Sequence, residues 1–187
     1  MPRLGETGRS SATGITIPSH WPASPGRISS PSSTIAKDEF SMADHSERER
    51  NKARKRVNDH MSRYLKTGGE DGHIWGGVPT LLLTTIGRES GNPNTTPLIY
   101  GRDGNRYILV ASRSGAPLNP GWYRNLSKTP GVEIQIKTGH FRAHARTATT
   151  EEKPDLWSIM AKLWPPFLEY QTRTDRDIPV VVLELTA

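Results

Sequence analysis

The sequence contains no cysteine among its 187 residues. Disulfide bridges, thiolate metal ligands and a cysteine nucleophile are therefore excluded, and the composition is consistent with a reducing compartment. The chain also lacks any uninterrupted apolar run near the roughly 20 residues that cross a bilayer, and its N-terminus lacks the apolar centre of a secretory signal. These absences predict a cytoplasmic protein.

Several catalytic and nucleotide-binding motifs are also missing. No GxGxxG or GxxxxGK[ST] pattern follows an expected strand, and neither HExxH nor a paired-carboxylate cluster occurs. His140 and His144 fall on one face of a regular strand. In a sheet, however, such a histidine pair is more often a pair of surface residues than a pair of metal ligands. We therefore expect no metal site, and a reaction in which a cofactor performs the difficult step is favoured.

Lysine and arginine number 25 against 19 acidic residues, which gives a formal net charge of +6. This excess favours an anionic partner, whether nucleic acid, an anionic membrane or a phosphorylated small molecule. No nucleic-acid partner is expected, because no aromatic or Arg-Gly pattern interleaves with the basic residues.

Composition divides the chain into three regions. Residues 1–45 are rich in Ser, Pro and Gly and show no apolar period, which predicts a disordered tail. Residues 46–68 predict a basic amphipathic helix, with an apolar face formed by Val57, Met61, Tyr64 and Leu65. This helix can pack on the following domain, lie on an anionic membrane surface or contact an anionic ligand, and the sequence leaves these alternatives open. Residues 69–187 form the expected folded domain.

The domain contains apolar, β-prone runs separated by turns. Strands are expected at residues 80–86, 96–100 and 106–111, with a tight turn at Asp103-Gly104 before the third strand. A second hairpin is expected around Thr138-Gly139, and the apolar run that closes the chain predicts a central strand. Because the strands lie in hairpins and no βαβ rhythm occurs, we expect an α+β fold in which an antiparallel sheet closes into a small barrel.

Two short helices are expected among the strands. One begins after Asn119, whose side chain can cap it. The other follows Thr149 and Glu152, which stand in capping-box register. The charged loop before the last strand contains Asp175 and Arg176, which we expect to form a structural pair.

Three blocks of the domain carry a resemblance to a known family: LLLTTIGRESGNPNTTPL, VASRSGAPLNPGWYRNL and WPPFLEYQTRTDRDIPVVVLE. In order and spacing, residues 79–185 resemble the deazaflavin-dependent nitroreductase family. The resemblance implies a split β-barrel, an FMN-binding-like fold with a few flanking helices, and coenzyme F420 as the cofactor. It also implies an oxidoreductase that takes a hydride from C5 of the reduced deazaflavin and reduces a quinone or a nitroaromatic compound.

The resemblance further implies which residues form the site. The cofactor-binding residues are Thr85, Gly87, Arg88, Ser90, Gly91, Pro97, Ser112, Arg113, Ser114, Gly115, Asn119 and Trp122. Ser112 and Tyr170 are the candidate catalytic residues, and the substrate pocket is formed by Trp164, Phe167 and Tyr170.

The chemistry of these residues agrees with that implied site. The F420 tail is anionic, so Arg88 and Arg113 can donate charge-assisted hydrogen bonds to it. Gly87, Gly91 and Gly115 let backbone N–H groups come close to the same anionic tail. Simpler alternatives stay open. Both arginines can belong to surface turns, Asn119 is foremost a helix cap, and Trp122 can be a core anchor beneath the helix.

The sequence departs from the family pattern at Phe167, where nitro-reducing members have a tyrosine, and at Glu89, where the family commonly has a basic residue. Phe cannot donate a hydrogen bond to a developing anion, so efficient nitro reduction is not expected. Quinone reduction is less affected by the missing donor at Phe167 if Ser112, Tyr170 or water supplies the proton.

Two other functions remain as alternatives: an FMN-binding split-barrel oxidoreductase and a non-catalytic protein that stores F420. The aromatic residues between Trp164 and Tyr170 can form a second aromatic wall of the site, in addition to Trp122. This second wall favours catalysis over storage, because it makes sense over a bound substrate and is superfluous in a protein that only stores the cofactor. An exposed edge strand would permit a homodimer.

Overall fold

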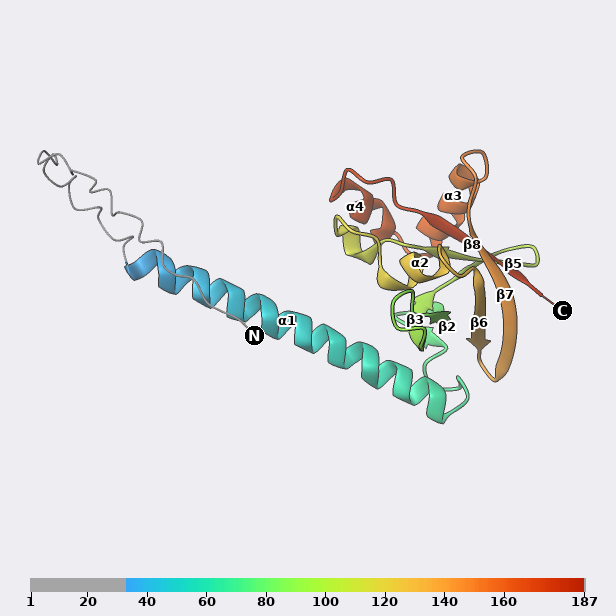
Figure 1. The fold of residues 1–187 in the computed structure, drawn as a ribbon, viewed down its shortest axis with the longest axis horizontal. Coiled ribbons are helices and arrows are strands. Elements are labelled where there is room, and N and C mark those ends of the chain that lie inside the picture. Colours follow the sequence, from blue (N-terminus) through green and yellow to red (C-terminus); the bar gives the residue numbers. More distant parts are fainter. Residues whose placement is uncertain (1–32, 187) are drawn as a thin grey trace, which may run out of the picture. The chain divides into compact units, whose positions relative to one another are not determined.

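The computed structural model describes residues 33–186 (Figure 1), and within the chain Asp44–Ala187 form one compact unit. The tail expected at residues 1–45 therefore lies largely outside the described residues. Helix α1 (Ser33–Lys66) begins at Ser33 rather than Ser46, so the expected boundary at residue 45 does not hold for the helix. The segment before Ser46 contains Ala, Lys, Glu and Met, which are good helix formers and allow the helix to extend at its N-terminal end.

An eight-stranded sheet forms the body of the domain, and all of its strand pairs are antiparallel. The strands are β1 (Ile74–Trp75), β2 (Val78–Ile86), β3 (Pro93–Ile99), β4 (Gly101–Asp103), β5 (Arg106–Val110), β6 (Gly131–Ile136), β7 (Gly139–Thr147) and β8 (Val180–Leu185). Their order is β1-β2-β6-β7-β8-β5-β4, with β3 paired to β2. The sheet curls into a half-barrel, which confirms the expected α+β split β-barrel (Figure 1).

Turn chemistry fixes the two expected hairpins. Between β4 and β5 the chain turns at Gly104, whose φ of +57° suits a residue without a Cβ. Between β6 and β7 the turn is formed by Lys137 and Thr138, because Gly139 already pairs with Ile136. The second hairpin is thus confirmed, but its turn lies one residue before the expected position.

Three helices and a 3-10 turn cover the sheet: α2 (Gly121–Leu126), α3 (Lys153–Leu163), α4 (Pro166–Thr172) and η1 (Arg113–Gly115). One core cluster lies inside the curled sheet and includes Trp122 and Leu126 of α2. A second cluster lies on the other face of β5 and β8, beneath α3 and α4. Strand β8 lies between β7 and β5, and its side chains are apolar on both faces because both faces are covered. Its continuous apolar run predicted this central position.

The capping box before α3 is confirmed. The Thr149 backbone N–H donates to Glu152 Oε2 over 3.0 Å, and the Glu152 N–H donates to Thr149 Oγ1 over 3.3 Å. Each side chain therefore satisfies a backbone donor that the first turn leaves without an intrahelical partner.

The C-terminal end of α1 packs on the barrel through Tyr64 and His60. The Tyr64 side chain is fully buried, and its hydroxyl accepts a hydrogen bond from the Lys137 N–H over 2.8 Å. The His60 ring stacks on Trp75 at 4.4 Å, and its Nε2 lies 2.7 Å from the Gly72 carbonyl oxygen. Leu65 was expected on the buried face but is 54% exposed, because successive helical residues point about 100° apart and Tyr64 occupies the contact.

Across residues 33–186, no helix is both long enough and apolar enough to span a membrane.

Candidate functional site

Helix α2 connects two of the segments that the sequence singles out. The segment of residues 112–119 leads into its N-terminus, and the turn after β2, residues 87–92, contacts its C-terminal end. The second contact is made by Asn125, which is buried in α2 and was not among the expected site residues. Asn125 lies in the block VASRSGAPLNPGWYRNL, one helical turn after Trp122. This spacing places both residues on the same face of a short amphipathic helix, and it is the feature of the sequence that could have identified Asn125 as a site residue.

Asn125 holds the β2–β3 turn through both ends of its amide. Its Nδ2 donates to Thr85 Oγ1 over 3.2 Å, while its Oδ1 accepts from the Arg88 N–H over 3.2 Å and from Arg88 Nη1 over 3.3 Å. Lys128 Nζ adds a hydrogen bond to the Arg88 carbonyl oxygen over 3.0 Å. The turn that carries Arg88 is therefore fixed by α2 and the residues just after it.

The Arg88 guanidinium also pairs with a neighbouring carboxylate. Arg88 Nη2 donates to Glu89 Oε1 over 2.7 Å, and the Glu89 side chain is 80% exposed. A solvent-exposed ion pair of this kind contributes little stability, so an arriving anion can displace the carboxylate from Arg88.

The backbone after β5 has an unusual conformation. Ser112 is right-handed, with φ −70° and ψ −43°, and the next residues, Arg113, Ser114 and Gly115, have φ of 47°, 54° and 79°. A right-handed residue followed by a left-handed one turns successive backbone N–H groups toward one side and forms an anion-binding concavity. Among the described residues, the Arg113 side chain has no ion pair or hydrogen bond, so its charge is available to an anion at the same place.

Asn119 does not cap α2, which corrects the sequence-based expectation. The residue before the helix is Pro120, which makes no side-chain capping hydrogen bond, and Asn119 stands one position too early. The Asn119 Oδ1 instead accepts a hydrogen bond from Arg176 Nη1 over 2.9 Å. The expected Asp175–Arg176 pair is also wrong, because the Arg176 guanidinium turns to the segment of residues 111–119.

The three expected substrate-pocket residues lie at the end of α3 and on α4. Phe167 is only 5% exposed and packs in the second core cluster, with its ring 6.2 Å from that of Tyr170. Tyr170 is half-buried, and the Arg173 guanidinium lies 5.5 Å from its ring centre. Trp164 is also half-buried and reaches the β1–β2 turn, where a Cβ added at Gly76 would lie 3.7 Å from the indole. Tyr170 and Trp164 are therefore the accessible members of this group.

Five of the expected cofactor residues are buried: Thr85, Pro97, Ser112, Gly115 and Trp122. Trp122 is 7% exposed and belongs to the core cluster inside the sheet. Pro97 pairs with Leu82 across β2 and β3, on the outer face of the sheet. Their cofactor contacts stay predictions.

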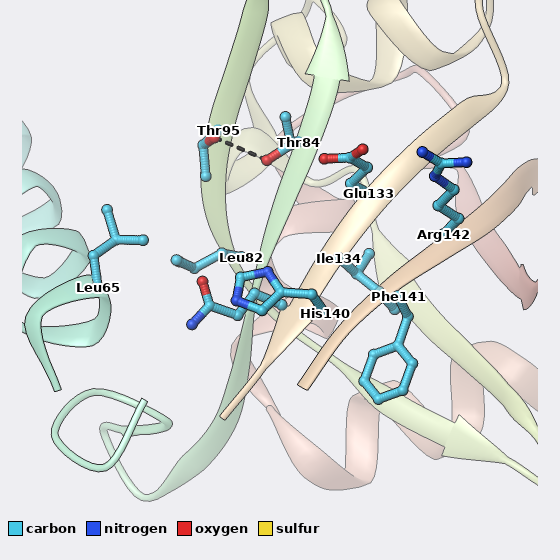
Figure 2. Close-up of a pocket in the computed structure, with 10 residues that line it drawn as sticks. Leu65, Leu82, Thr84, Thr95, Glu133, Ile134, His140, Phe141 and Arg142 are labelled. Atoms are coloured by element: carbon cyan, nitrogen blue, oxygen red, sulfur yellow. Dashed lines mark hydrogen bonds between the residues drawn. The ribbon is translucent and has the colours of Figure 1, made fainter. Parts of the chain in front are cut away.

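A separate pocket of about 400 Å³ lies on the outer face of the sheet, and Figure 2 shows the residues that line it. Glu133 and Arg142 lie opposite each other there in the β6–β7 pairing. The pocket is lined by Leu65, Leu82, Thr84, Thr95, Glu133, Ile134, Gln135, His140, Phe141 and Arg142, which include none of the expected site residues. Within residues 33–186, no cluster of three possible metal ligands is present.

Burial lowers the pKa of Arg176, and the nearby Arg113 lowers this pKa further. The two guanidinium groups therefore repel each other, and an anion bound beside Arg113 would relieve that repulsion.

Comparison with known proteins adds direct information on the family. Residues 54–185 match the family model described as F420H(2)-dependent quinone reductase. An F420H(2)-dependent quinone reductase of Mycobacterium tuberculosis is 43% identical over 129 residues, which cover 66% of this chain and 86% of that protein.

Two solved structures share the fold. One, described as a domain-swapped dimer, is 34% identical with a TM-score of 0.56 and covers 71% of this chain and 99% of its own. The other, an F420-H2 dependent reductase, is 37% identical with a TM-score of 0.53 and covers 57% of this chain and 94% of its own. The chain therefore belongs to the F420H(2)-dependent quinone reductase family, and it is an F420H2-dependent oxidoreductase with coenzyme F420 as its cofactor, as the resemblance implied.

Proposed function

We propose that this oxidoreductase reduces a quinone, with the anionic part of F420 held at the segment of residues 112–115 and at Arg88. When bound, reduced F420 supplies a hydride from its deazaflavin ring. The relatives of this chain named as quinone reductases support the choice of substrate.

One observation carries the proposed cofactor position: the Arg113 guanidinium, which has no hydrogen bond or ion pair within the described part of the chain, lies on the concave Ser112–Arg113 backbone. Backbone N–H groups and a guanidinium together suit phosphate or carboxylate oxygens, because both donate charge-complementary hydrogen bonds. Arg88 adds a second positive charge from a turn that Asn125 keeps in place. The residues present thus fit an anionic cofactor.

The substrate side favours a quinone over a nitro compound. Quinone reduction to the quinol adds a hydride and one further proton, and the proton can come from a weakly acidic hydroxyl or from water. Ser112 and Tyr170 carry such hydroxyls, whereas Phe167 has none. A phenyl ring cannot donate a hydrogen bond to the negative charge that develops when a nitro group is reduced.

The test is an equilibrium titration of the full chain with F420 and, separately, FMN, followed by fluorescence at low and high salt. We expect F420 binding that weakens as salt rises, because exposed charge pairs are screened. Turnover of reduced F420 is then measured with menadione and with a nitroimidazole, and faster reduction of menadione is expected. Preference for FMN, or equal rates on both substrates, would contradict the proposal.

We also propose a homodimer. A relative that this chain resembles at 34% identity is described as a domain-swapped dimer, and strands β3 and β4 each pair on one side within the sheet. Light scattering coupled to size exclusion is expected to give twice the 20.8 kDa chain mass. Contact of α1 with an anionic membrane stays a prediction from its basic sequence.

A further inference from the structure

Arg176 connects both ends of the segment that precedes α2. Its Nη2 donates to the carbonyl oxygens of Ala111 and Ser112 over 3.1 and 2.6 Å. Its Nε donates to the Ala116 carbonyl oxygen over 2.9 Å, and its Nη1 donates to Asn119 Oδ1 over 2.9 Å. One planar guanidinium therefore fixes the backbone before and after the left-handed residues Arg113 to Gly115.

Those left-handed residues need such support. Two of them, Arg113 and Ser114, carry a Cβ, and side-chain-bearing residues rarely adopt a left-handed conformation without surrounding structure that enforces it. Within the segment itself, the Gly115 N–H bonds to the Ser112 carbonyl oxygen and the Ala116 N–H bonds to the Arg113 carbonyl oxygen. Arg176 adds four hydrogen bonds from outside the segment.

The loop that carries Arg176 is itself attached to α4. Gln171 Nε2 donates to the Arg176 carbonyl oxygen over 2.9 Å, and Gln171 Oε1 accepts from the Ile178 N–H over 3.0 Å. Helix α4 also contacts the segment directly, since a Cβ added at Gly115 would lie 2.6 Å from the Tyr170 carbonyl oxygen. Substrate-side Tyr170 and cofactor-side Ser112 and Arg113 are therefore parts of one connected structure.

We infer that Arg176 is a positioning residue for F420: it holds the segment of residues 111–119 in its anion-binding conformation and couples that segment to α4. The inference rests on the proposed cofactor position at residues 112–115. Arg176 acts through the backbone, because its donors are directed to protein oxygens and its partners span both ends of the segment. A lysine has a single ammonium group and cannot reproduce this planar set of donors.

The test compares Arg176→Gln and Arg176→Lys with the wild-type full chain. In the absence of cofactor, hydrogen exchange at the Gly115 and Ala116 amides is expected to accelerate in Arg176→Gln, because both amides are hydrogen-bonded only while the segment keeps its conformation. The F420 dissociation constant is expected to rise by about tenfold to a hundredfold, as a misplaced binding segment would cause. Arg176→Lys should recover part of both effects.

Arg146→Gln is the matched control. Arg146 makes three side-chain hydrogen bonds to Glu152 and Glu184, remote in sequence from the segment. Its loss should lower the melting temperature while leaving exchange at Gly115 and Ala116 and the F420 dissociation constant unchanged. A purely structural role for Arg176 would give this same pattern in Arg176→Gln and would overturn the inference.

The outcomes separate the two proposals. If the wild-type chain fails to bind F420, the proposed function fails, and the exchange measured without cofactor still shows whether Arg176 orders the segment. If the wild type binds F420 and Arg176→Gln binds it equally well with unchanged exchange, the inference fails alone. Should Arg176→Gln not fold, Asn119→Ala removes one of the four hydrogen bonds and should change both readouts in the same direction by a smaller factor.

Discussion

At the scale of single residues, Asn125 sets the position of the turn that carries Arg88. Replacing Asn125 with Ala leaves Thr85 Oγ1 and the Arg88 N–H without these partners, and Thr85 is buried. We expect the free energy of unfolding to fall by about 1–3 kcal/mol, the usual cost of leaving buried polar groups unsatisfied. Urea denaturation of both proteins measures this difference.

Asn125→Asp is the comparison variant. It keeps an acceptor oxygen that faces Arg88, replaces the donor to Thr85 with a second acceptor oxygen, and adds a negative charge beside the Arg88 guanidinium. The loss of stability should therefore be smaller than in Asn125→Ala. Equal losses in the two variants would show that the contacts to Arg88 contribute nothing measurable.

At the scale of elements, Glu152 joins the start of α3 to two strands. Its carboxylate accepts hydrogen bonds from Arg146 of β7 and Arg106 of β5, and it also completes the capping box with Thr149. These contacts, the Arg146 guanidinium first, lower the pKa of Glu152 well below its usual range. The charged carboxylate is therefore the form that stabilises the fold.

The direction of the pH effect follows from this lowered pKa. The contribution is complete above the unfolded-state value of about 4.3 and is lost as the pH falls toward the folded-state pKa. Glu152→Gln should therefore melt at a lower temperature than the wild type at pH 7, and the difference should shrink as the pH falls below about 4. Thermal unfolding from pH 7 to pH 3 measures the gap, and a gap independent of pH would argue against the charge effect.

The β4–β5 turn gives a second prediction at this scale. A Cβ at Gly104 would meet open space, but its φ of +57° is a left-handed conformation that is unfavourable for most residues with a Cβ, alanine included. Gly104→Ala should lower the free energy of unfolding by about 1–2 kcal/mol. Gly131→Ala, which also meets open space and has no positive φ, should change stability much less in the same denaturant titration.

At the scale of the whole molecule, Tyr64 joins α1 to the barrel. Burial raises the pKa of Tyr64, so its phenol keeps its proton and can donate to the carbonyl oxygen of Thr80 or of Gln135 while accepting from Lys137. Tyr64→Phe keeps the buried ring and should cost about 1–2 kcal/mol through the lost hydrogen bonds alone. Chemical denaturation measures that cost.

Tyr123→Phe serves as the control for the same chemical change. The Tyr123 hydroxyl bonds to Thr147 Oγ1 at the surface, so we expect a change within about 0.5 kcal/mol. If both variants lost equal stability, the hydroxyl of Tyr64 would have no special part in holding α1 on the barrel.

The sequence by itself determined those features that depend on neighbouring residues. The hairpin at Gly104, the capping box of Thr149 and Glu152 and the central strand β8 were all expected, since turn chemistry and apolar period act over a few residues. The family was also readable, because its motifs are contiguous blocks of residues.

Only the tertiary structure decided the contacts between segments that are distant in the chain. Local sequence rules predicted Asn119 as a helix cap and Arg176 as one half of an ion pair with Asp175. In the structure the two side chains instead form a hydrogen bond with each other. Asn125 reaches back to Thr85 and Arg88 in the same way. A polar side chain bonds to whichever partner the fold brings within about 3 Å, and local sequence does not specify that partner.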